Sequence, residues 1–362
     1  MRGLPAAGAD LKVQPLLNPE LHQSESLPEA VRQAGRAAAW SPMRWRHRIV
    51  AAVTLIALAV LITIPGRGLR NYVARVRLFA VCARELKQIS EFSIDTASPY
   101  LVKTLQERPT LVGVAAWPYI NGQWTTRERF SCLRNHYREL DDLPALQIGT
   151  REAKVISDLG DVVPGLRLVI DRPNWFMREG ELTINLFTDE FRAYSLAFSV
   201  GRAGGERVLF VGCIQGRQAD NVDQLYRELT KKLHGWRPRD LMVSLVQMIG
   251  SASGARTIRL VSEAARVHRH EYFGHKGESL VSANYDDIWR EHQAVPGRGG
   301  FFDLGTQLHQ REPHEIASNK RAMYRRRYEL MDRIQADVAA MMTPRPAGQA
   351  TWRAAEAPAI QA

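Results

Sequence analysis

The chain has 362 residues, of which 45% are hydrophobic and 24% are charged, the composition of a globular protein with an ample core. Basic residues outnumber acidic ones by 49 to 38, giving a formal net charge of +11, and only 8 of the basic residues are lysine. This excess suits an anionic membrane surface, a lipid phosphate or an acidic carrier protein. Three scattered cysteines without C-x-x-C spacing predict neither a disulfide framework nor a zinc site, and they favour a reducing compartment for the main domain.

The amino-terminal region predicts membrane attachment. Residues 1–42 are rich in Ala, Pro and Gln and are expected to be disordered, as is the tail at 343–362. Residues 43–66 contain an apolar run from Ile49 to Ile64 in which nothing is more polar than threonine. At ~1.5 Å per residue this run spans roughly 24 Å, less than the ~30 Å hydrocarbon core. The segment therefore predicts a short transmembrane anchor helix with snorkelling arginines, and a buried core helix is the alternative.

Beyond the anchor, residues 67–155 are predicted to be mainly helical and residues 156–342 to form an α/β core. The clearest period-two pattern is "AYSLAFSV" at 193–200, and "GRAGGE" after it predicts a tight hairpin. Further strands are expected at 166–170, 180–187, 207–216, 257–261 and 300–304. The fold class is therefore α/β (α+β), with a mixed, largely antiparallel sheet flanked by helices.

Helical spacing predicts several helices in the second half of the chain. Asp220 is expected to cap a helix that Gly235 ends, and Pro238 is expected to open the next one. A short helix is predicted around "DDIWREH", and a long final helix from Pro313 to Met342.

Five blocks, found in order between about residues 75 and 340, resemble the VirK/YbjX family, a bacterial family with a domain of unknown function. They are "LFTDEFRAYSLAFSV", "VGCIQG", "ELTKKLHGWRPRDLM", "SANYDDIWRE" and "IASNKRAMYRRRYELMD". The resemblance implies association with the cell envelope, and for some members virulence, surface-protein localisation and resistance to cationic antimicrobial peptides. Together with the anchor, it predicts a protein of the bacterial inner membrane whose main domain lies in the cytoplasm.

The order of elements also resembles that of GNAT-type acyltransferases, in which antiparallel strands precede a helix, a strand, a helix and a last strand. That fold binds the pyrophosphate of coenzyme A at the start of the helix after its fourth strand. The matching place here offers Gly216 and Arg217, but it lacks the full Gln/Arg-x-x-Gly-x-Gly/Ala pattern, and Asp220 would compete with a phosphate. The resemblance implies coenzyme A or an acyl carrier thioester as a donor.

The junction between the two helices in "LTKKLHGWRPRDLM" is a candidate ligand site. It gathers charged and aromatic side chains that suit phosphate or carboxylate binding and stacking, namely Lys232, His234, Trp236, Arg237 and Arg239. The alternative is a structural corner, in which the lysines favour the helix end, Arg239 pairs with Asp240 and Trp236 fills the core.

His268, which follows the strand at 257–261, is the candidate general acid or base. A metal site with His270 and His275 is not favoured, because the spacing of His268 and His270 does not share one helical face. Tyr285 is a further candidate ligand contact, although the aspartates after it also suit a helix start.

Cations at the start of the final helix, Lys320, Arg321 and Arg325, suit the phosphates of a lipid or of an acidic carrier protein. The alternative is a solvated helix face with local ion pairs. Nucleic acid is not favoured as a partner, because no recognised binding module is present. Gly-x-Ser-x-Gly, P-loop and kinase signatures are absent from the sequence.

These observations predict a membrane-associated envelope protein that acts as an acyl- or aminoacyl-type transferase. His268 would exchange the proton, and Arg237 and Arg239 would hold an anionic group. The alternative is a non-enzymatic envelope or virulence factor that binds a partner protein or anionic lipid.

Overall fold

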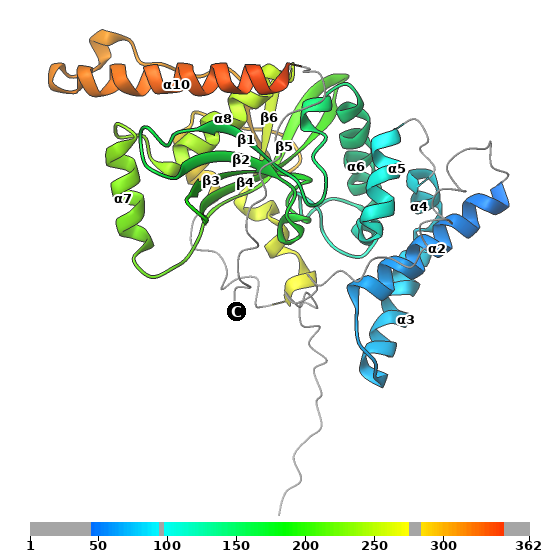
Figure 1. Ribbon diagram of the computed structural model, residues 1–362. Coiled ribbons are helices and arrows are strands. Elements are labelled where there is room, and N and C mark those ends of the chain that lie inside the picture. Colours follow the sequence, from blue (N-terminus) through cyan, green and yellow to red (C-terminus); the bar gives the residue numbers. More distant parts are fainter. Residues whose placement is uncertain (1–44, 94–97, 275–283, 344–362) are drawn as a thin grey trace, which may run out of the picture.

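An eight-stranded sheet lies at the centre of the protein, as seen in a computed structural model that describes residues 45–93, 98–274 and 284–343 (Figure 1). The strands are β1 Ala153–Asp158, β2 Leu166–Asp171, β3 Leu182–Thr188, β4 Phe191–Ala203, β5 Glu206–Gly216, β6 Thr257–Val261, β7 Val295–Pro296 and β8 Phe301–Gly305. Their order in the sheet is β1-β2-β3-β4-β5-β6-β8-β7. Every neighbouring pair is antiparallel except β5 and β6, which run parallel.

The hairpin between β4 and β5 forms where the sequence predicts it. Ala203 pairs with Glu206, so Gly204 and Gly205 make a two-residue turn with φ values of 60° and 83°. Two positive φ angles in a row suit a type I′ turn, which glycine adopts without strain. This turn fixes the register of the two longest strands.

A β-bulge interrupts the pairing of β4 with β5. Ala197 pairs with Cys213 and Phe198 with Val211, which leaves Gly212 without a partner on β4. A side chain at Gly212 would lie 2.2 Å from the carbonyl oxygen of Glu179, so only glycine fits this contact. Bulges bend a strand and increase its local twist.

Helices pack around this sheet, and some of them pack mainly on other helices. They are α2 Trp45–Thr63, α3 Leu69–Arg84, α4 Leu86–Ser93, α5 Pro99–Glu107, α6 Thr126–Asp141, α7 Val222–Lys232, α8 Pro238–Ala252, α9 Tyr285–Glu291 and α10 Arg321–Met342, with a 3-10 helix η1 at Pro109–Ala115. The α8 helix packs against β3, β4 and β5, and α10 packs on α8 and along β1. Figure 1 shows α2, α3 and α4 on the far side of α5 and α6 from the sheet. The coarse class predicted from the sequence, a mixed and mostly antiparallel sheet with helices, is confirmed.

The predicted transmembrane anchor at 43–66 is not found. Within the described residues, no helix combines the length and the apolar character needed to cross a membrane. The segment instead forms α2, which buries Ala52, Ile56, Ala59 and Val60 against η1 and α4. These positions recur every three or four residues, as on a helix with one face in the core. The run was apolar enough to suggest a bilayer because one face packs on protein and the other carries exposed valines and leucine.

Three local predictions differ from the structure. Asn221, not Asp220, precedes α7, and its φ of 61° leaves that helix without a side-chain cap. The last helix begins at Arg321, because Ile316 and Ala317 are extended after a 3-10 turn at Pro313–Glu315. Strands β1 and β7 were not predicted. The predicted disorder at 1–42 lies outside the described residues, as does the tail from residue 344.

A fully buried ion pair joins the helical part to the sheet. The Arg172 side chain donates to Glu181 at 2.8 Å, and both side chains are at most 1% exposed. The Tyr137 hydroxyl of α6 donates to the same carboxylate oxygen at 2.7 Å, and the Tyr100 hydroxyl of α5 accepts from Arg172 at 2.9 Å. Burial by itself raises the pKa of the Glu181 carboxyl, but the Arg108 guanidinium 3.7 Å away, Arg172 and the Tyr137 hydroxyl hold it below its usual range.

We expect Glu181→Ala to lower the free energy of unfolding by about 3–5 kcal/mol, because Arg172 would remain buried without its counter-charge. Asp287→Ala is the matched control, since Asp287 pairs with Arg290 at an exposed position and its loss should matter far less. Urea unfolding followed by circular dichroism measures both. Equal losses for the two variants would contradict this assignment.

Candidate functional site

Strands β5 and β6 part near the bulge. Their parallel pairing extends from Val208 with Thr257 to Val211 with Leu260, whereas β5 continues to Gly216. Beyond this point the backbone of Ile214 is met by the buried hydroxyl of Tyr285, which accepts from the Ile214 N–H at 3.0 Å and donates to its carbonyl at 2.8 Å. One side-chain hydroxyl therefore makes the two hydrogen bonds that a neighbouring strand would otherwise make with Ile214.

Glu179 reaches this region from the segment before β3, where its backbone crosses Gly212. The residue is 6% exposed, and its Oε2 atom is buried without a hydrogen-bond partner. Burial raises the pKa of the Glu179 carboxyl to about 7, although the Arg178 and Arg266 guanidiniums pull it down. A buried carboxyl that titrates near neutrality is typical of proton-transfer sites.

His268 lies beside this carboxyl, just after the end of β6. Its Nε2 atom is 3.8 Å from Glu179 Oε1, and its side chain is 21% exposed. The imidazole stacks on Phe273, with ring centroids 5.1 Å apart. Burial, together with the nearby positive charges of Arg266 and Arg178, lowers the pKa of His268 to about 4. The imidazole is therefore neutral at physiological pH and available to accept a proton.

Two arginines surround the pair. The Arg266 guanidinium lies over the Tyr285 ring at 3.8 Å from its centroid and donates to Glu263 at 3.2 Å. The Arg178 guanidinium is enclosed by the rings of Trp117, Tyr272 and Phe273, at 5.0 to 5.6 Å from their centroids. Aromatic faces hold both cations in position, and the Glu263 carboxylate also binds Arg266.

The group formed by Glu179, His268, Cys213 and Tyr285, here called the divergence cluster, can exchange a proton. Below about pH 7 the Glu179 carboxyl carries that proton, and above it the carboxylate faces a neutral imidazole. An imidazolium formed by proton abstraction would then be stabilised by the carboxylate 3.8 Å away. Burial raises the pKa of the Cys213 thiol to about 12, so this thiol is not a ready nucleophile.

The structure gives the junction arginines protein partners. Arg237 donates to Asp240 at 2.6 Å and to Glu291 of α9 at 2.7 Å, and Arg239 also donates to Glu291. Trp236 is buried, which matches the alternative of a structural corner. His234 is left-handed at φ 55°, and its carbonyl accepts two bonds from Arg327 of α10.

The junction and the divergence cluster lie at opposite ends of α9. Tyr285 opens this helix at the cluster, and Glu291 closes it at the junction. Six residue steps of ~1.5 Å separate them by about 9 Å along the axis. Burial raises the pKa of the Tyr194 hydroxyl, and the nearby Arg239 of the junction lowers it in part. Lys232 stands outside this network on the exposed end of α7.

The proposed phosphate position after β5 is only partly formed. Gly216 ends β5 so close to the Tyr226 hydroxyl, 2.7 Å from where a Cβ would stand, that a larger residue does not fit. The Arg217 guanidinium stacks over Phe191 at 5.4 Å. No side chain caps α7, so the competition expected from Asp220 does not arise there.

The cations at the start of α10 do not converge on one point. Arg321 donates to the Ile316 carbonyl at 3.2 Å, whereas Lys320 and Arg325 are exposed. Nor do the described residues contain a group of three or more His, Cys, Asp or Glu side chains that could hold a metal ion. His275 lies outside the described residues.

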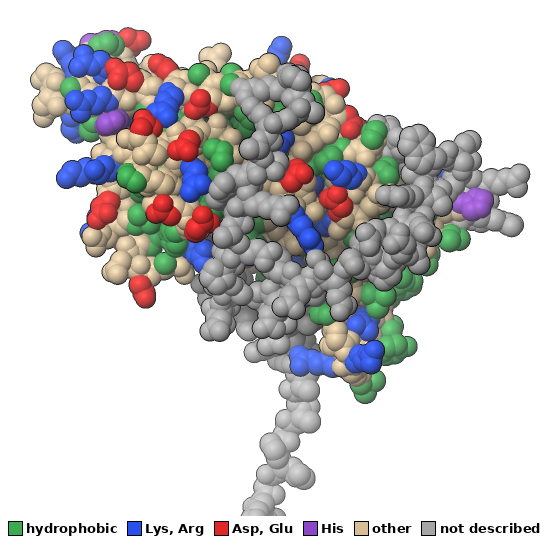
Figure 2. Space-filling model, viewed as in Figure 1, with side chains coloured by type: hydrophobic (Ala, Val, Ile, Leu, Met, Phe, Trp, Pro, Cys, Tyr) green, Lys and Arg blue, Asp and Glu red, His purple; other side chains and the backbone are tan. Residues whose placement is uncertain are grey.

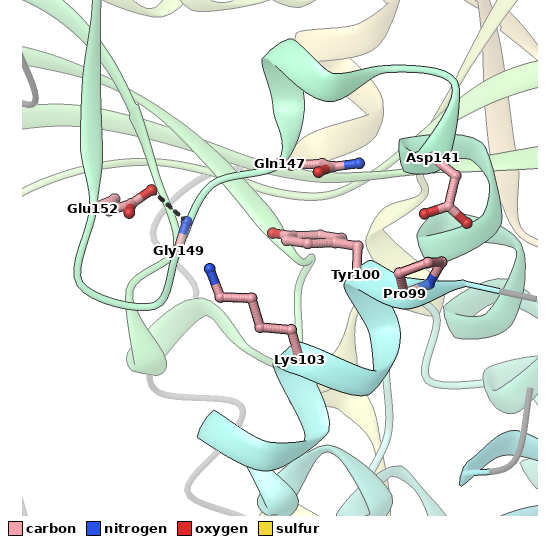
Figure 3. A pocket seen from close by; sticks show the side chains of 7 residues that line it. All are labelled: Pro99, Tyr100, Lys103, Asp141, Gln147, Gly149 and Glu152. Carbon is pink, nitrogen blue, oxygen red and sulfur yellow. Dashed lines mark hydrogen bonds between the residues drawn. The ribbon is translucent and has the colours of Figure 1, made fainter. Parts of the chain in front are cut away.

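A cavity of about 520 Å³ opens elsewhere, between α5 and the loop that leads to β1. Figure 3 shows Lys103 and Tyr100 of α5 facing it from one side and Glu152 from the other, where Glu152 accepts from the Gly149 N–H. The Tyr100 hydroxyl is already bonded to the Ile148 carbonyl and to Arg172. The cavity therefore adjoins the buried ion pair and shares no residue with the divergence cluster.

The sequence singled out His268 and Tyr285, which the structure brings into the divergence cluster, and did not single out Glu179. The signal available was a glutamate two residues before Glu181 and next to glycine, in "REGEL" at the start of a predicted strand. Only the crossing of this segment over the Gly212 bulge brings Glu179 to His268. No local pattern encodes that crossing.

The amino-acid sequence of this chain is similar to a family model and to several known bacterial proteins. A family model described as a protein of unknown function, DUF535, matches residues 67–340. YbjX of Escherichia coli, an uncharacterised protein, is 27% identical over 256 residues, 67% of this chain and 75% of that protein. An uncharacterised protein of Haemophilus influenzae is 29% identical over 161 residues, and this match covers about half of that relative, 52%.

A protein of Mannheimia haemolytica named membrane protein LapB is 22% identical over 202 residues, 54% of this chain and 85% of that protein. No solved structure matches the chain with significance.

The buried carboxyl of Glu179 leads to a prediction about stability and pH. Its folded pKa of about 7 exceeds the ordinary 4.5, so between these values the folded state holds a proton that the unfolded state has lost. Stability from this group is complete below pH 4.5 and falls as pH rises through 7, by on the order of 3 kcal/mol. We expect Glu179→Gln to gain stability relative to the wild type as the pH is raised.

Urea unfolding at about pH 5 and pH 8 measures the difference. His268 has an opposite effect on pH dependence, because its lowered pKa makes stability rise between about 4 and 6.5, but it is present in both proteins. Glu329→Gln, at an exposed position on α10, is the control. A Glu179→Gln difference that does not change with pH would show that the carboxyl is ionised throughout.

Proposed function

This chain belongs to the DUF535 family, the VirK/YbjX family, and we propose that it is a membrane-associated envelope protein that transfers an acyl or aminoacyl group from a thioester. The observation that carries this proposal is the pair of His268 and Glu179 at the parting of β5 and β6, with Nε2 and Oε1 3.8 Å apart. A partly exposed neutral imidazole backed by a buried carboxyl is suited to take a proton from an attacking amine or hydroxyl.

The architecture supports a GNAT-like interpretation. Antiparallel strands lead to β5, a helical segment with α7 and α8 connects to the parallel strand β6, and α9 leads to the last strands. This is the order of elements in the acyltransferases that the sequence resembles. Since many functions share one fold, the assignment depends on the divergence cluster and not on topology alone.

We infer that a thioester donor with an extended amide-bearing arm binds the strand edge at Ile214 by displacing the buried Tyr285 hydroxyl. The N–H and C=O groups of Ile214 meet one hydroxyl, that of Tyr285, and an amide can make the same two bonds in the manner of an added strand. Arg217, three residues further along, supplies a cation on the route of the arm, next to the uncapped start of α7. A free coenzyme A thioester and a carrier-bound thioester share this chemistry.

In the transfer itself, His268 accepts the proton of the nucleophile as the new bond forms to the carbonyl carbon. The carbon–sulfur bond then breaks, and the proton passes from the imidazolium to the departing thiolate. Glu179 stabilises the imidazolium while its carboxyl is ionised, so the rate is expected to rise with pH through about 7.

Arg237 and Arg239 keep their proposed role only under one condition. They hold an anionic group of donor or acceptor if that group displaces Glu291, which both arginines now bind. Lys232 stands exposed at the edge of the same corner.

We place the protein at the bacterial inner membrane with its main domain in the cytoplasm. This proposal is supported by the name of the LapB relative and by the free, buried cysteines.

A binding and turnover experiment on the full chain tests the transferase proposal. Thermal shifts are measured with acetyl and longer acyl coenzyme A thioesters, with acylated carrier protein and with anionic lipid headgroups, at two salt concentrations. Thiol release is followed in parallel. His268→Ala is expected to bind the donor normally but to release thiol about 10²- to 10⁴-fold more slowly, as for loss of a general base. His314→Ala, at an exposed position, is the control.

Glu179→Gln adds a second readout, because it should flatten the rise of the rate through about pH 7. Stabilisation by every polyanion that vanishes at high salt would overturn the donor site. It would favour the alternative, a non-enzymatic envelope factor that binds a partner protein or anionic lipid.

A further inference from the structure

We propose that the outer face of α2 and α3 rests on an anionic lipid surface, with both helices lying along the membrane and not across it. This inference rests on the proposed membrane association, which it makes specific by naming the surface and the partner. It does not depend on the transfer chemistry, so either proposal can fail without the other.

Exposed hydrophobic side chains are concentrated on these helices. Of the eleven large hydrophobic side chains that are exposed in the described residues, only Val155, Trp175 and Val295 lie outside residues 50–81. On α2 the exposed positions are Val50 and Leu61, on the side away from its buried face, and Val53 at the edge of that face. Concentrations of this kind on a soluble domain mark interaction sites.

The α3 helix carries a continuous stripe. Leu69, Tyr72, Val73 and Val76 recur every three or four residues, and Leu69 is 80% exposed. Arg70 and Arg77, one heptad apart, lie along one side of this stripe, and both are exposed. An apolar stripe with guanidiniums along its edge suits a helix at the boundary of headgroups and acyl chains.

The charge of this region has one sign. Residues 45–84 contain seven arginines and neither aspartate nor glutamate. Figure 2 shows green and blue side chains next to each other over α3, at the lower right of the view. Each cation near an anionic leaflet contributes a similar amount to the free energy of binding. Burial of the apolar side chains among the lipids adds to it.

Hydrogen bonds fix the position of α3 relative to α2. Arg75 donates to the carbonyls of Ile64 and Gly66, at 2.9 and 2.7 Å, and Asn71 donates to that of Pro65 at 3.0 Å. These bonds tie the end of α2 to the side of α3. The opposite side of α2 is packed on η1, so the two helices present their outer residues from a fixed base.

Charge also decides between possible occupants. A second copy of the same face would bring Arg70 and Arg77 of one copy against the same arginines of the other, with no acidic residue between 45 and 84 to pair with them, and like-charge repulsion opposes this. The chain before this face, residues 1–44, carries five basic and four acidic residues, so it brings no net negative charge to neutralise the arginines. An anionic lipid surface complements both the apolar stripe and its cations.

Co-sedimentation of the full chain with vesicles tests the inference. Vesicles of phosphatidylcholine alone are compared with vesicles that also contain phosphatidylglycerol, and free glycerol phosphate is added as a competitor. Binding should require phosphatidylglycerol, and the soluble phosphate should not displace it. Arg70→Gln and Arg77→Gln should each weaken binding about fivefold, and Val76→Ser about tenfold.

Matched controls are Arg325→Gln on α10 and Val295→Ser on β7, which are exposed and should bind like the wild type. Loss of binding in Arg325→Gln but not in the α3 variants would overturn the inference in favour of α10. So would equal binding to both vesicle types. Light scattering without lipid gives a further check, since self-association that Val76→Ser abolishes would assign the face to a second copy of the chain.

Discussion

The contact between the Gly212 backbone and the Glu179 carbonyl organises the centre of this protein. Because Gly212 has no side chain, the segment before β3 crosses β5 at the bulge, where the strand bends and β6 stops following it. The same crossing brings the Glu179 carboxyl into a buried place beside His268. The parting of the strands and the proton-exchanging pair therefore have one structural cause. A residue larger than glycine at position 212 would disturb both together.

Many arginines bind carboxylates or aromatic rings within the protein, and this changes how the net charge of +11 is interpreted. Arg172 is buried against Glu181, Arg266 covers Tyr285, and Arg237 joins α8 to α9. Cations with such partners contribute little to attraction at a distance, because their fields are largely cancelled nearby. The exposed arginines of α3 have no acidic residue in their own helix pair, so the surface potential is expected to be strongest there.

The sequence predicted the elements whose patterns are local. The hairpin at Gly204 and Gly205, the corner at Gly235 and the strand at Thr257–Val261 follow from turn chemistry and periodicity. It did not predict the site pair, because the approach of Glu179 to His268 depends on a bulge and a crossing that join segments some ninety residues apart. The apolar run in α2 misled for a different reason. Its hydrophobic residues lie on two faces, one packed on protein and one exposed. Composition alone does not distinguish such a helix from one that spans a bilayer.

A continuous set of packed elements connects the α2–α3 face to the divergence cluster. The α2 helix packs on η1, which packs on α6, and the Tyr137 hydroxyl of α6 is bonded to Glu181. Glu181 lies two residues from Glu179 on the segment that crosses the bulge. Each step is buried, so the face and the cluster have a fixed relation within the folded domain. If the face lies on lipid, the His268 side chain, which is 21% exposed, has a fixed height and direction relative to the membrane. An acceptor anchored in that membrane would then meet the imidazole only within a narrow range of reach.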